Sequence, residues 1–192
     1  MKKIVLFICL FLLVLETNIL AQQITEDTTY IKSPDGYEYW YDGKGNLIHE
    51  KGSDGGEAWY DEKGNPFHVK CPDGEEIWTD FDIKGNPVHY KSSTGEELWY
   101  KYNSFGEKIY SKVSTGGETW YNKRGSPIHQ KWPDGEELWY DDYGNPIHSK
   151  NNITGDEVWA EYDSKGNMIH KKFSDGTEFW YNDKGNIIKT KP

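Results

Sequence analysis

Apolar, aromatic and charged residues recur along this chain in a unit of about twenty residues. One complete unit is "PDGEELWYDDYGNPIHSK" at 133–150, in which polar and apolar residues alternate around Trp and again before the closing Lys. Such alternation is typical of β-strands, and no segment has helical periodicity. Eight tryptophans mark the units: Trp40, Trp59, Trp78, Trp99, Trp120, Trp139, Trp159 and Trp180. Repetition at this period predicts an array in which neighbouring units shelter each other's side chains.

Two glycine positions punctuate each unit and predict its turns. One follows Asp or Thr, as in "PDGE" and "STGE", and the other lies in "EKGN" or "DYGN". Glycine suits the left-handed backbone of hairpin turns, so each unit is predicted to be two antiparallel strands of about five residues. Residues 33–192 are therefore expected to be all-β, with about sixteen strands in an elongated antiparallel sheet or a solenoid. Some units are two residues longer, and we expect the extra residues to lengthen one hairpin loop.

The turn at 71–75 fits a three-residue loop, which predicts the register of its hairpin. The predicted pairs are Lys70 with Glu76, Val69 with Ile77, and His68 with Trp78. Alternation then places Glu, Trp, His and Lys on one face, and the Ile-type and Tyr positions on the other. Two such loops per unit would put successive tryptophans on opposite faces. One bulge per unit restores a common face, and the prolines at 66, 87, 127 and 146 are the candidate positions.

The first 21 residues have a different character. Lys2 and Lys3 precede an unbroken apolar run from Ile4 to Leu15, which is typical of a secretory signal peptide and short for a membrane span. We expect cleavage after Ala21, and the alternative is an uncleaved N-terminal anchor. The predicted organisation is a signal peptide at 1–21, a short lead at 22–32 and a repeat domain at 33–192. The protein is expected to be secreted, periplasmic or on the outer cell surface, with no membrane span once the signal is removed.

The composition excludes several function classes. The formal net charge is -10, and Arg124 is the only arginine, so nucleic acid is not an expected partner. The two cysteines are Cys9, inside the predicted signal, and Cys71, so no disulfide is expected within the mature chain.

The histidines and carboxylates raise the possibility of a metal or catalytic site, but their spacing argues against both. Equivalent histidines in adjacent units lie two strands apart, or about 9.6 Å at a strand spacing of about 4.8 Å, whereas ligands of one zinc ion each lie about 2.1 Å from it. The carboxylates occupy equivalent environments, while an acid–base pair needs two different ones. "DFDIKGN" at 80–86 departs from a calcium loop because Lys84 occupies a ligand position. We expect no enzyme activity, no cofactor and no metal site.

The aromatic rows supply the candidate binding residues, because an open sheet of short strands cannot bury all of them. Rows of Trp and Tyr at regular spacing are suited to docking a protein or stacking on sugar rings. We expect the eight tryptophans to be structural. The candidate ligand row is the residue that follows Trp: Tyr41, Tyr60, Tyr100, Tyr121, Tyr140 and Tyr181.

The unit also resembles known bacterial repeats over about residues 33–192. "WYDEKGNPFHVK" at 59–70 resembles the Tyr-Asp (YD, RHS-type) repeats, and the "DGxExWY" pattern resembles MORN-like repeats. The resemblance implies an elongated, non-enzymatic sheet or solenoid used for binding or assembly. The arginine typical of the YD unit after its turn glycine is missing here, and so is the Gly-Trp of choline- and glucan-binding repeats, which argues against choline binding.

These observations favour an exported binding or scaffold module for a protein partner. Two alternatives stay open. One is a carbohydrate-binding module for cell-wall or glucan polymers, and the other, by analogy with MORN-like repeats, is an immunity-type protein that neutralises a toxin.

Overall fold

The computed structural model describes residues 20–25 and 28–192, and this part of the chain consists of strands joined by tight turns. The strands are β1 (Leu20–Thr25), β2 (Thr28–Lys32), β3 (Glu38–Asp42), β4 (Leu47–Lys51), β5 (Glu57–Tyr60), β6 (Pro66–Lys70), β7 (Glu76–Phe81), β8 (Pro87–Ser92), β9 (Glu97–Tyr102), β10 (Lys108–Val113), β11 (Glu118–Tyr121), β12 (Pro127–Lys131), β13 (Glu136–Tyr140), β14 (Pro146–Asn151), β15 (Glu157–Tyr162), β16 (Met168–Phe173), β17 (Glu178–Tyr181) and β18 (Ile187–Lys191). The predicted signal peptide lies largely outside the described residues. Within them, no helix is long and apolar enough to cross a membrane.

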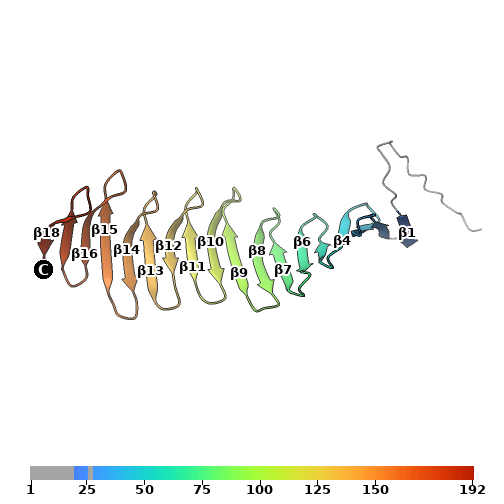
Figure 1. The fold of residues 1–192 in the computed structure, drawn as a ribbon, viewed down its shortest axis with the longest axis horizontal. Coiled ribbons are helices and arrows are strands. Elements are labelled where there is room, and N and C mark those ends of the chain that lie inside the picture. Colours follow the sequence, from blue (N-terminus) through green and yellow to red (C-terminus); the bar gives the residue numbers. More distant parts are fainter. Residues whose placement is uncertain (1–19, 26–27) are drawn as a thin grey trace, which may run out of the picture.

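Every strand pairs antiparallel with the next one along the chain. Packing between elements is likewise confined to strands that are consecutive in sequence, so the protein is one long, open, single-layer sheet (Figure 1). Residues 33–192 contain the sixteen strands β3 to β18, which confirms the predicted all-β fold. Strand β2, within the predicted lead, continues the same pattern, because Tyr30 pairs with Trp40 and Lys32 with Glu38.

The turns are fixed by the Asp, Gly and Asn residues of the repeat. In the turn at 61–65, the Asp61 N–H donates to the Asn65 carbonyl at 2.9 Å, and the Gly64 N–H donates to the Asp61 carbonyl at 3.0 Å. Gly64 has a φ of 82°, which a residue with a side chain adopts only at a cost. The Asp61 carboxylate accepts from the N–H groups of Lys63 at 2.8 Å and Asn65 at 2.9 Å, and from the Asn65 side chain at 2.9 Å. These polar residues therefore shape the hairpin.

One bulge per unit keeps the tryptophans on a common face. Between β5 and β6, Trp59 pairs with His68 while Tyr60 pairs with Pro66, so Phe67 is the extra residue. The same shift occurs in all eight hairpins of the repeat domain that contain this turn. The bulge lies beside the Pro-type position, as the sequence predicted.

The expectation that the longer units lengthen a hairpin loop is wrong. Strand β7 has 6 residues whereas β5 has 4, and the following turn keeps its hydrogen bonds, with the Asp82 N–H to the Asn86 carbonyl at 2.9 Å. The two added residues extend the strand because residues in the ladder gain backbone hydrogen bonds and cross-strand neighbours that a loop lacks. The register then moves by two residues, so Trp78 pairs with Lys91 instead of His89.

The sheet has no closed hydrophobic core. Among the residues whose side chains the structure describes, no hydrophobic side chain is buried, and Ser92 is the one buried polar residue. Most strand residues are half-exposed, sheltered by their neighbours on adjacent strands. Cross-strand pairs therefore supply the stability, and each unit depends chiefly on the units beside it.

Candidate functional site

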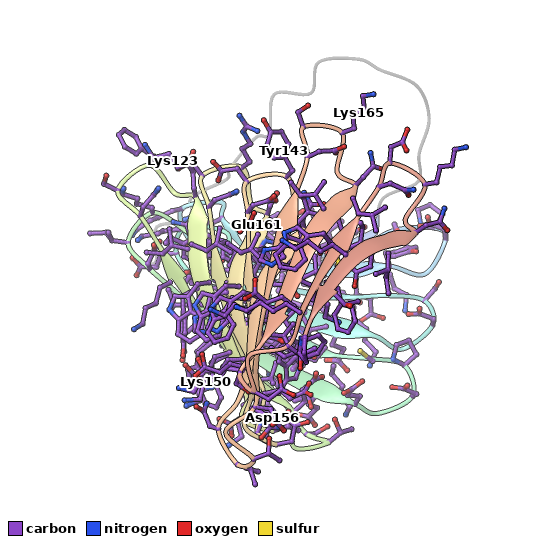
Figure 2. All side chains as sticks on the ribbon, turned by 90° about the vertical axis from the view of Figure 1, so that its left-hand side faces the viewer. Lys123, Tyr143, Lys150, Asp156, Glu161 and Lys165 are labelled. Carbon is purple, nitrogen blue, oxygen red and sulfur yellow. The ribbon has the colours of Figure 1, made fainter. Side chains whose placement is uncertain are left out.

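The single layer offers two faces and two edges of turns. We call the face that carries Trp59 and its equivalents the ladder face, and the face that carries Tyr60 and its equivalents the tyrosine face. Figure 2 looks along the sheet and shows side chains on both faces, with Lys123, Tyr143 and Lys165 at one turn edge.

On the ladder face, tryptophan and histidine rings alternate from strand to strand. The Trp59 ring stacks between His49, at 4.6 Å between centroids, and His68, at 4.5 Å. The Trp139 ring likewise stacks between His129 and His148, each at 4.5 Å. Offset stacking of this kind stabilises aromatic pairs beyond the area that they bury. The predicted register is confirmed here, since His68 pairs with Trp78, Val69 with Ile77 and Lys70 with Glu76.

The glutamate two residues before each tryptophan is held by histidine or lysine side chains of the preceding strand. Glu57 lies 3.0 Å from His49 Nε2 and accepts from Lys51 Nζ at 3.2 Å. Equivalent ion pairs to His or Lys involve Glu38, Glu76, Glu97, Glu118, Glu137, Glu157 and Glu178. The hydrogen bond from His148 lowers the pKa of Glu157, and a bond from Lys191, on the following strand β18, lowers the pKa of Glu178.

These His–Glu pairs were missed by the sequence analysis. The predicted register gives residues directly opposite each other, whereas His49 and Glu57 are diagonal neighbours on one face. The signal was available, because diagonal positions lie within reach of long side chains. The pairs also give the repeated histidine a structural role. No group of three or more His, Cys, Asp or Glu residues in the described part of the chain could hold a metal ion, and Cys71 is a free thiol.

The candidate ligand row lies on the tyrosine face, and all six of its members are half-exposed: Tyr41, Tyr60, Tyr100, Tyr121, Tyr140 and Tyr181. The hydroxyls of Tyr60, Tyr121 and Tyr140 reach back to the preceding hairpin, where Tyr121 bonds with Ser111 at 2.9 Å. The Tyr60 hydroxyl donates to Glu50 at 2.6 Å, and the Tyr140 hydroxyl donates to Gln130 at 2.5 Å. Desolvation, together with the bond to Glu50, raises the pKa of Tyr60 to about 12. The hydroxyl edge of such a ring is therefore partly engaged within the sheet, while part of each side chain stays open to solvent.

The tyrosine row is interrupted at Thr79 and Ala160, which follow Trp78 and Trp159. A hollow of about 240 Å³ lies around Ala160. Its walls include Leu138, Pro146, Ser149, Val158, Tyr162, Met168 and Lys171. A second hollow, of about 470 Å³, continues from Met168 and Lys171 to Tyr181 and the last turn. The predicted row names only the tyrosines that are present, and the signal in the sequence for this hollow is the position after Trp159 where tyrosine is absent.

The fold and its surfaces define a tandem β-hairpin repeat protein that consists of one open sheet. No protein-family model matches the chain, and no curated protein matches it. Solved structures are similar to it in part. A crystal structure of TcdB2-TccC3 is 12% identical with a TM-score of 0.42, and covers 85% of this chain and 11% of its own, so the present chain spans a small part of that protein. The wild-type TCP10 domain of Danio rerio CPAP, in complex with a peptide of Danio rerio STIL, is 13% identical with a TM-score of 0.36, and covers 91% of this chain and 99% of its own.

Proposed function

We propose that this protein is an exported, non-enzymatic binding scaffold whose tyrosine face docks a protein partner. The observation that carries the proposal is the hollow at Ala160, because it interrupts a row of tyrosines on a face that no second layer covers. Apolar and aromatic side chains grouped on an exposed face are a common mark of interaction sites in other proteins. The repeat supplies the rigid surface, and its interruption supplies the anchor point.

The side chains around the hollow suit a protein better than a small polar ligand. Leu138, Val158 and Met168 form apolar walls, and Tyr162 adds an aromatic ring whose hydroxyl donates to the Pro146 carbonyl at 3.1 Å. Tyr and Met are enriched in the cores of protein interfaces, and binding energy concentrates where one side chain fills a pocket. The formal net charge of -10 favours a basic partner and an association rate that falls as salt rises.

The proposed location is the periplasm, the outer cell surface or the surrounding medium. The apolar run from Ile4 to Leu15 after two lysines supports it. Mass spectrometry of the protein from separated cell fractions tests this part directly. The expected mature N-terminus is Gln22, and an intact Met1 on cytoplasmic material would refute export.

The substitution Ala160→Tyr tests the binding site, because it fills the hollow with the residue that the repeat itself uses. We expect the wild type to capture a protein from the cell envelope reproducibly, and to capture less of it as salt rises. The variant should fold and should capture at least tenfold less of that protein. Thr79→Tyr is the matched control, since it fills the other interruption of the row and should leave capture unchanged. Equal capture by wild type and Ala160→Tyr would show that the partner does not bind at the hollow.

A further inference from the structure

The two-residue extensions break the aromatic column of the ladder face at three steps. In each, the tryptophan pairs with lysine instead of histidine: Trp78 with Lys91, Trp99 with Lys112, and Trp159 with Lys172. In a shorter unit, the residue at the histidine position of the next strand pairs with the tryptophan. Here it pairs with the residue two positions after the tryptophan. These partners are Asp80 with His89, Lys101 with Tyr110, and Glu161 with His170.

At each of the three steps, one face of the indole ring is left without a ring partner, and Trp99 at the second step stacks on His89 at 5.1 Å. In the described residues, Trp78 stacks on His68 alone, at 5.0 Å, and Trp159 stacks on His148 alone, at 5.1 Å. These two residues are 40% and 38% exposed, and they are the most exposed tryptophans of the described chain. Lysines lie beside both rings: Lys91 pairs with Trp78 and its Nζ lies 3.4 Å from Glu97, while Lys172 Nζ lies over the Trp159 ring, 6.0 Å from its centre.

A carboxylate–imidazole pair lies beside the indole at the first and third steps. Asp80 Oδ2 is 3.2 Å from His89 Nδ1, and Glu161 Oε1 is 3.4 Å from His170 Nδ1. Both carboxylates are largely exposed, at 77% and 68%. Each imidazole is held from its other side, His89 by Glu97 at 3.3 Å and His170 by Glu178 at 3.0 Å. Each carboxylate is thus oriented by a histidine ring that is itself held in place, and it can still accept hydrogen bonds from a ligand. Figure 2 labels Glu161, which lies between the turn edges marked by Lys165 and Asp156.

The second step lacks this chemistry. Lys101 stands where Asp80 and Glu161 stand in the other two, and its Nζ lies 5.0 Å over the Tyr110 ring. Trp99 is also less exposed than Trp78 and Trp159. The chain therefore contains two similar sites and one natural counterpart without the carboxylate.

We propose that the steps at Trp78 and Trp159 are two equivalent sites for a neutral glucan-type polysaccharide. The flat indole face suits the apolar C–H face of a pyranose with equatorial hydroxyls. The adjacent carboxylate accepts hydrogen bonds from the hydroxyls at the rim of the same ring, and Lys91 or Lys172 donates at the other side. The surplus of negative charge repels anionic polymers, which leaves neutral ones. This goes beyond the proposed protein docking and uses the opposite face of the sheet.

The spacing of the sites adds a length requirement. Strands β7 and β15 are eight strands apart, which is about 38 Å at a spacing of about 4.8 Å per strand. One long polymer can reach both sites and a short oligosaccharide cannot, so the second binding event becomes intramolecular only for the polymer.

Affinity electrophoresis in hydroxyethylcellulose and calorimetry with cellohexaose test the proposal. Wild type should bind the polymer at least tenfold more tightly per protein than the hexasaccharide. The double substitution Asp80→Lys with Glu161→Lys, which installs the residue of the second step, should reduce polymer binding at least tenfold. Asp80→Lys alone should bring polymer affinity down to that of a single site. Glu62→Lys with Asp142→Lys changes the net charge equally at exposed turn positions and should have no effect.

A second pair separates the indoles from the fold. Trp78→Leu with Trp159→Leu should abolish binding while the far-UV circular dichroism of the sheet persists. Absence of wild-type binding to both probes overturns the proposal, and so does binding that survives either double substitution. Loss of a protein partner, but not of glucan, in the Trp78→Leu and Trp159→Leu variant would assign these rings to a protein interface instead. Ala160→Tyr should leave glucan binding intact, which distinguishes failure of this proposal from failure of the protein-docking one.

Discussion

Substitution of Trp139 by leucine should destabilise the sheet more than the same substitution at Trp78. The Trp139 ring has two stacked neighbours, His129 and His148, each at 4.5 Å, whereas the Trp78 ring has His68 alone, at 5.0 Å. An aromatic pair contributes about 0.5–1.5 kcal/mol beyond its buried area. The loss from stacking is then about 1–3 kcal/mol at Trp139 and about 0.5–1.5 kcal/mol at Trp78. The expected difference is about 1 kcal/mol, because leucine replaces part of the apolar area in both variants.

Urea unfolding followed by far-UV circular dichroism measures the overall loss, and hydrogen exchange shows where it falls. Because each unit contacts only its neighbours, Trp139→Leu should raise exchange most in β12, β13 and β14, with little change in β4 and β5. Trp78→Leu should act on β6 and β7. A larger loss for Trp78→Leu, or an exchange increase spread evenly over the chain, would refute the view that the stacked column holds the sheet locally.

Three further predictions follow from the same contacts. The His148 bond lowers the pKa of Glu157 from its ordinary 4.5, and the Asn65 bond lowers that of Asp61 from 3.8, so the folded state binds protons less readily than the unfolded chain. Stability should therefore be full above about pH 4.5 and fall as the pH drops below it, which urea midpoints near pH 7 and near pH 3 would check. Desolvation and the Glu50 bond raise the pKa of Tyr60 from 10.0 to about 12, so Tyr60→Phe should remove one tyrosinate absorbance step near pH 12, and Glu50→Gln should move that step toward pH 10. Stability supplied by the neutral Tyr60 is correspondingly present below pH 10 and lost as the pH rises through about 12. Deletion of 115–133 joins β10 to β13 in the repeat register and should leave a folded, shorter sheet by small-angle scattering, whereas global unfolding would contradict a linear array.

The register of the sheet could be predicted from its sequence because turn length and side-chain alternation determine it together. The three-residue loop at 71–75 predicts the pairing of Lys70 with Glu76, and the need for a common tryptophan face predicts the bulge beside Pro66. The effect of the two-residue extensions could not be predicted in this way. Lengthening a strand and lengthening a loop both preserve alternation, and only the hydrogen bonds of the following turn distinguish them.

The candidate surfaces were less accessible to sequence reasoning. Which tryptophan keeps an open ring face depends on the register shift at Trp78 and Trp159, and this shift becomes visible only once strands are paired. The hollow at Ala160 likewise depends on Leu138, which belongs to the preceding unit, and on Met168, which lies on the paired strand β16. Repetition indicates which residues build the sheet. The positions that depart from it carry the candidate sites. A side chain that packs against its neighbours in the sheet is not free to contact a partner, so the two functions require different residues at the same position.

The central claim is that repeated residues hold the sheet while departures from the repeat bind partners. The most direct test measures partner capture and urea unfolding together for Ala160→Tyr and Tyr60→Ala. Restoring the repeat at Ala160 should abolish capture and leave the unfolding midpoint unchanged or higher. Removing the repeated side chain at Tyr60, with its hydrogen bond to Glu50, should lower the midpoint and leave capture intact. Capture that persists in Ala160→Tyr, or that disappears in Tyr60→Ala with an unchanged midpoint, would contradict the account.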